Sequence, residues 1–136
     1  MKYFPPVAAG LLGFAFVAIG LMFLLHIGPP PPELPPGSPE AMFMGAFGPT
    51  GYMTFVKVLE VLGGVLVAIP ATRNFGLLIL GPIIVNILAF NIFVLKGTQL
   101  WKPPIVPIIV VLALYLLWCG RREFAGLARS DRPVTV

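Results

Sequence analysis

Histidine and cysteine, the side chains that most often hold metals and redox groups, occur once each in this sequence, as His26 and Cys119. A single cysteine excludes an internal disulfide, a CxxC redox pair and a four-thiolate iron–sulfur site. A single histidine excludes bis-histidine haem ligation and two-histidine metal sites within the chain. We therefore expect no intrinsic cofactor, no metal site and no catalytic residues, and an enzyme is the less favoured class.

Charged residues are also scarce. They make up 10% of the 136 residues, against about 25% in a typical soluble domain, while 58% of the chain is hydrophobic. The net charge of +4 does not indicate a nucleic-acid partner, because the basic residues stand at the ends of apolar segments and not on one helix face. The composition predicts a single membrane domain over residues 1–136 whose main partner is the lipid bilayer.

Four apolar runs predict membrane-spanning helices, at about residues 7–27, 53–70, 75–95 and 103–119. At 1.5 Å per residue the first run crosses a hydrocarbon core of about 30 Å, and no A-x-A-like cleavage site follows it, so we expect a retained span. Small residues at Ala9, Gly13, Gly20 and Gly63-Gly64 predict faces where helix backbones approach closely. The four-residue turn 71–74 predicts that the second and third helices are antiparallel neighbours.

The first connection is rich in proline. Residues 28–40, GPPPPELPPGSPE, predict a stiff outer loop that acts as a spacer. Ser38 as N-cap and Pro39 at the first position then predict a short helix. We expect this helix to lie at the membrane interface, with Met42, Phe43 and Phe47 dipping into the lipid, and to stop at Gly48-Pro49.

Basic residues predict the orientation of the chain. Lys2, Arg73 and the arginines of the polar tail 120–136 fall on one side of a four-span topology, against Lys96 and Lys102 on the other. The positive-inside rule then places both termini in the cytoplasm and the proline-rich loop outside. The predicted fold is all-α, an integral membrane four-helix bundle with a short interfacial helix after the first span.

The charged and amide side chains within the apolar second and third spans are those of Lys57, Glu60, Asn86 and Asn91. Counted along the helices, Glu60 lies about 10 Å below the outer boundary, between the levels of the two asparagines. Because the asparagines are about 140° apart on an ideal helix, we expect one of them to point toward a different helix. His26 falls at the boundary itself, where an interfacial role is favoured over that of a ligand.

A carboxylate at this depth requires compensation. Lys57, three residues earlier on the same face, can neutralise Glu60, or the carboxyl can stay protonated and donate to an asparagine. Two roles follow with equal weight: a structural polar clamp between the two helices, or a ligand-facing or proton-handling site.

Three stretches of the sequence are similar to known proteins: residues 57–64, KVLEVLGG, residues 81–88, GPIIVNIL, and AMFMGA with GY after the proline-rich loop. In these stretches the sequence resembles the DoxX-like family of small four-helix membrane proteins. The resemblance implies a bacterial or archaeal plasma-membrane protein linked with redox systems, including quinone-reducing thiosulfate oxidation and thiol-related stress complexes. Related sequences often carry histidine where this chain has Asn91, and asparagine neither titrates near neutral pH nor binds metal well.

Three functions remain open at this point. The favoured one is a non-catalytic accessory subunit that packs through small-residue helix faces onto other subunits of a membrane redox or energy-converting complex. The second is a quinone- or thiol-linked oxidoreductase component with an outer-leaflet pocket around Glu60 and Asn86, where a quinone or lipid binds. The third is a small-solute or proton carrier, disfavoured because no polar path reaches the cytoplasm.

Overall fold

The computed structural model describes residues 4–97 and 104–128, and this part of the chain is helical without strands. The elements in order are α1 (Phe4–Leu24), α2 (Pro39–Phe47), the 3-10 turn η1 (Gly48–Thr50), α3 (Tyr52–Ala68), α4 (Arg73–Ala89), the π-helical turn η2 (Phe90–Val94), α5 (Ile105–Cys119) and α6 (Arg121–Ala128). Some residues used in the predictions lie outside the described residues: Lys2, Lys102, Arg129 and Arg132 of the orientation argument, and Pro103 at the start of the predicted fourth span.

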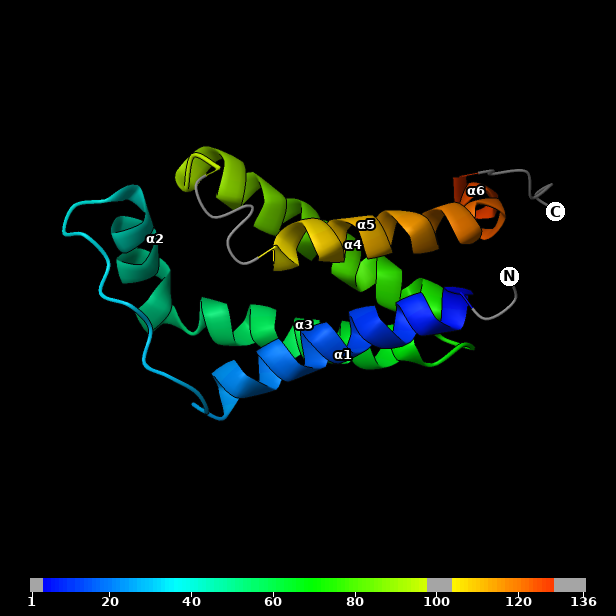
Figure 1. The fold of residues 1–136 in the computed structure, drawn as a ribbon, viewed down its shortest axis with the longest axis horizontal. Coiled ribbons are helices and arrows are strands. Elements are labelled where there is room, and N and C mark those ends of the chain that lie inside the picture. The colour runs from blue at the N-terminus through cyan, green and yellow to red at the C-terminus, as the bar shows by residue number, and fades with distance from the viewer. Residues whose placement is uncertain (1–3, 98–103, 129–136) are drawn as a thin grey trace, which may run out of the picture.

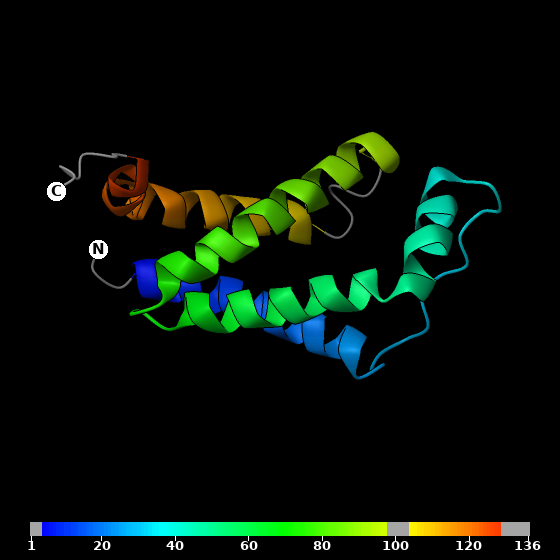
Figure 2. The ribbon, with the colours of Figure 1, turned by 180° about the vertical axis from the view of Figure 1, so that it is seen from behind.

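Helices α1, α3, α4 and α5 run lengthwise and form a closed ring of contacts (Figures 1 and 2). In this ring α3 packs between α1 and α4, and α5 completes it by contacting α4 and α1. The start of α1, the α3–α4 turn and the end of α5 lie at one end of the molecule, and α2 with the proline-rich loop lies at the other (Figure 1). The α3–α4 turn therefore joins antiparallel neighbours, as predicted.

The small residues of the sequence serve this internal packing. A Cβ on Gly13 of α1 would lie 2.5 Å from the carbonyl oxygen of Gly64 on α3, so the two backbones touch. On the opposite side of α3, a Cβ on Gly76 of α4 would lie 2.5 Å from the backbone nitrogen of Val67. The predicted close approach of helix backbones is confirmed, and it occurs within this chain.

Much of the surface is apolar. Large hydrophobic side chains such as Phe14, Val85, Val111 and Leu114 are exposed along the outer faces of the long helices. An exposed apolar surface of this extent is typical of a face that contacts lipid or another protein. Two helices, Phe4–Leu24 and Arg73–Val94, are long and apolar enough to span a membrane, and up to four spans result if each sharply bent helix pair counts as one.

The helix ends differ from the predicted span boundaries for local reasons. The first helix ends at Leu24, and His26 adopts a left-handed φ of 53°, which stops the helix. Helix α3, the second predicted span, ends at Ala68 because Ile69 precedes Pro70 and is extended, with ψ of 121°. With 17 residues α3 is about 25 Å long, and α5 has 15 residues.

Two predicted connections are confirmed. The Ser38 hydroxyl accepts a hydrogen bond from the Ala41 amide at 3.2 Å and caps α2, with Pro39 in the first turn. The α3–α4 turn is closed by Thr72, whose hydroxyl donates to the Leu66 carbonyl at 2.9 Å. This bond satisfies one of the carbonyls that a helix leaves free at its C-terminus.

Candidate functional site: a polar-lined cavity between α2, α3 and α4

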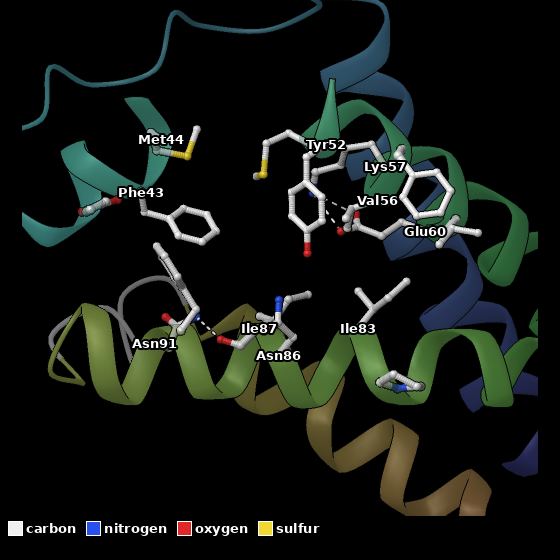
Figure 3. A pocket seen from close by; sticks show the side chains of 16 residues that line it. Phe43, Met44, Tyr52, Val56, Lys57, Glu60, Ile83, Asn86, Ile87 and Asn91 are labelled. Carbon is white, nitrogen blue, oxygen red and sulfur yellow. Dashed lines mark hydrogen bonds and ion pairs between the residues drawn. The ribbon is translucent and has the colours of Figure 1, made fainter. Parts of the chain in front are cut away.

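A cavity of about 390 Å³ opens where α3 and α4 diverge beneath α2 (Figure 3). It contains all four polar residues that the sequence singled out, Lys57 and Glu60 from α3 and Asn86 and Asn91 from α4 and η2. The remaining lining is mostly apolar, aromatic or methionine: Glu40, Phe43, Met44, Tyr52, Met53, Phe55, Val56, Leu59, Pro82, Ile83, Ile87 and Phe90. The cavity lies at the end of the molecule that carries the proline-rich loop, where the sequence placed the polar residues.

Lys57 and Glu60 form a bidentate ion pair on one face of α3. The Lys57 ammonium lies 3.0 Å and 2.9 Å from the two carboxylate oxygens of Glu60. Residues three apart on a helix are surface neighbours, so this pair forms without distortion. The Glu60 side chain is 3% exposed and that of Lys57 17%, and the ammonium also lies 5.8 Å from the ring centre of Phe23 on α1. Of the two expected ways to compensate Glu60, the structure therefore contains the ion pair.

That the two asparagines point toward different helices stays a prediction, because the cavity that both of them line is bounded by α2, α3 and α4. Both side chains line the same cavity (Figure 3). The prediction assumed an ideal α-helix, but the backbone changes at Phe90 to a π-helical turn, whose i→i+5 bonding makes a wider turn. Asn91 is buried and donates to the Ile87 carbonyl at 2.8 Å, whereas Asn86 is exposed to the cavity. Neither asparagine is hydrogen-bonded to Glu60 in the described part of the chain.

Contacts between aromatic rings that the sequence did not reveal join α2 to the start of α3 and to η2 beside the cavity. The rings of Phe43 and Phe90 lie 4.9 Å apart, those of Phe43 and Phe47 4.8 Å, and those of Phe47 and Tyr52 5.0 Å. Phe43 thus packs against Phe90 of η2, whereas Met42 and Phe47 are exposed. These rings tie α2 over the cavity.

His26 does not line this cavity. It is exposed at the end of α1, where the Ile27 amide bonds back to the Met22 carbonyl at 2.9 Å and closes the helix end. Among the residues that the structure describes, no three His, Cys, Asp or Glu side chains come close enough to hold a metal ion. The cavity is therefore the strongest candidate site in the described chain.

The arrangement suits an amphipathic small molecule. The volume of the cavity falls within the range of about 300–1,000 Å³ that is common for ligand pockets. The Tyr52 ring reaches from α3 toward α4, and the Asn86 amide points toward it from the other side (Figure 3). These two groups add uncharged donors and acceptors to a lining that also carries charged side chains and is mostly apolar elsewhere.

No family model matches this sequence, and no solved structure matches it. A curated protein of Bacillus subtilis (strain 168), named "Uncharacterized protein YwoB", is 39% identical over 80 residues. The matched region covers 59% of this chain and 49% of that protein, so the chain spans about half the length of the curated relative it matches.

Proposed function

We propose that this protein is a membrane-embedded component that binds a small amphipathic molecule in the cavity between α2, α3 and α4. The observation that carries the proposal is that this one cavity gathers Lys57, Glu60, Asn86 and Asn91 from two helices. Polar side chains at membrane depth are costly, and they are most often retained where they serve a site.

The small-residue faces do not favour a role limited to packing against other subunits. Gly13, Gly64 and Gly76 contact neighbouring helices of the same chain, so these faces are already occupied. The accessory-subunit hypothesis does not depend on these faces. It is retained here in the form of a non-catalytic subunit that binds a ligand within a larger membrane complex.

The resemblance to DoxX-like proteins supports a redox system as the setting and a quinone as one ligand class. Quinone carbonyls accept hydrogen bonds, and Asn86, Tyr52 and the third N–H of Lys57 are donors in the cavity. Within this proposal the chain is a four-helix bundle in a plasma membrane, with both termini in the cytoplasm. The relative from Bacillus subtilis supports a bacterial plasma membrane.

A carrier function has less support. Glu60 and Asn91 are the only buried polar side chains in the described chain. The core toward the α3–α4 turn consists of residues such as Leu12, Phe16 and Leu80. A polar path through the bundle is therefore missing from the described residues, and a pocket closed on that side is better suited to binding than to transport.

Binding can be tested with menadione, a small quinone, on protein in lipid nanodiscs. Ile83→Trp fills the cavity from α4, and Val85→Trp places the same side chain on the exposed face of the same helix. Menadione should raise the midpoint of thermal unfolding of the wild type and of Val85→Trp, but not of Ile83→Trp. An unchanged midpoint in all three proteins would remove the quinone class.

A further inference from the structure

The cavity lining carries an excess of negative charge. Two carboxylates, Glu40 and Glu60, line it together with one ammonium, that of Lys57. Because Lys57 donates to both oxygens of Glu60, these two charges neutralise each other. Glu40, half-buried in the first turn of α2, has no cationic partner among the described residues. Its charge is therefore available to a ligand.

Aromatic rings surround the same space. Phe43, Tyr52, Phe55 and Phe90 line the cavity from α2, α3 and the start of η2. The face of an aromatic ring carries partial negative charge and attracts organic cations, and sites for quaternary ammonium groups are built from such rings. A carboxylate beside several rings, within apolar walls, is complementary to a cation with an apolar body.

We infer that the cavity selects a lipophilic organic cation, an aryl-substituted ammonium, over neutral or anionic molecules of the same shape. This inference rests on the proposed function, since it requires that the cavity binds a small amphipathic molecule. The cationic head would lie against Glu40 and the ring faces, and the apolar body against Ile83 and Ile87. Because a quaternary ammonium has no N–H, it does not compete with Lys57 in donating hydrogen bonds to the Glu60 carboxylate.

Two probes of the same shape isolate the effect of charge. Benzyltrimethylammonium is a cation, and neopentylbenzene replaces its nitrogen with carbon and is neutral. Binding of each to the full-length protein in nanodiscs is measured by saturation-transfer NMR titration, with empty nanodiscs subtracted to remove partition into lipid. The cation should bind about tenfold more tightly than the neutral probe, and phenylmethanesulfonate, the matched anion, should not bind.

Charge-neutralising variants locate the selectivity. Glu40→Gln removes the unpaired carboxylate of the cavity, and Glu33→Gln makes the same change in the exposed proline-rich loop. The preference for the cation should fall severalfold in Glu40→Gln and persist in Glu33→Gln. Phe90→Leu keeps the apolar wall but removes a ring, so it should weaken binding of the cation more than binding of the neutral probe.

Equal affinity of the two probes, or the same loss in both glutamate variants, would overturn the inference. Failure of the cation to bind at all would do so as well. In each of these cases the proposed function would still be supported if menadione raised the unfolding midpoint of the wild type but not that of Ile83→Trp. If no probe and no quinone is bound, both the inference and the proposed function fall.

Discussion

The Lys57–Glu60 ion pair allows a sharp prediction about the stability of the protein. The Glu60 carboxylate is almost fully buried, while Lys57 retains some access to its surroundings through a flexible stem. Removing either partner leaves one charge uncompensated, and the two single substitutions should therefore differ in cost.

Lys57→Met leaves the Glu60 carboxylate buried without a partner. Removing one partner of a buried pair costs about 3–5 kcal/mol, and we expect this variant to fall in that range. Glu60→Leu leaves Lys57, whose side chain can extend outward, so the cost should be smaller, about 1–2 kcal/mol. The double variant carries no stranded charge, and such replacements are often near neutral. It should therefore be more stable than Lys57→Met.

The free energy of unfolding can be measured by circular dichroism in mixed micelles with increasing denaturing detergent. Two control variants remove exposed charges: Glu33→Leu removes a negative charge, as Glu60→Leu does, and Arg122→Met removes a positive one, as Lys57→Met does. Each control should alter the free energy of unfolding by less than about 0.5 kcal/mol. Additive effects, with the double variant losing the sum of both single losses, would show that the two side chains are not energetically coupled, and the reasoning would be refuted.

Three further changes test the packing and the helix ends. His26→Gly should stabilise the protein by about 1 kcal/mol, because glycine adopts the left-handed φ of 53° without strain, and thermal unfolding would register a loss instead if the imidazole made a needed contact. Gly13→Ala should be less stable than Gly10→Ala by about 1–3 kcal/mol, since only the first Cβ meets a neighbouring backbone, and equal unfolding midpoints would contradict the close α1–α3 approach. Phe43→Leu should remove the ring contact with Phe90 and speed hydrogen exchange of the α2 amides about threefold or more, whereas unchanged exchange would mean that the contact does not hold α2.

The polar half of the site could be predicted from the sequence. Charged and amide side chains stand out within apolar runs, and helical spacing alone places Glu60 beside Lys57. Counting depth from the outer end also placed these groups near the proline-rich loop, where the cavity lies. Capping chemistry was equally readable, because Ser38 and Pro39 act locally.

The aromatic half could not be predicted. Phe43 meets Phe90 only because the chain bends by 83° between α2–η1 and α3, and no local pattern encodes that angle. The π-helical turn at Phe90–Val94 likewise has no evident sequence signal, and it contains Asn91, which lines the cavity. The orientation of α2 and the shape of the cavity therefore depend on contacts between helices distant in sequence.

The central claim is that the cavity holds a small amphipathic molecule. The most direct measurement is mass spectrometry of organic extracts from protein purified in mild detergent out of its native membrane, comparing the wild type, Ile83→Trp and Val85→Trp. A small molecule should be present in stoichiometric amount with the wild type and with Val85→Trp, and be lost when Ile83→Trp fills the cavity. Identical extracts from all three proteins would contradict the claim.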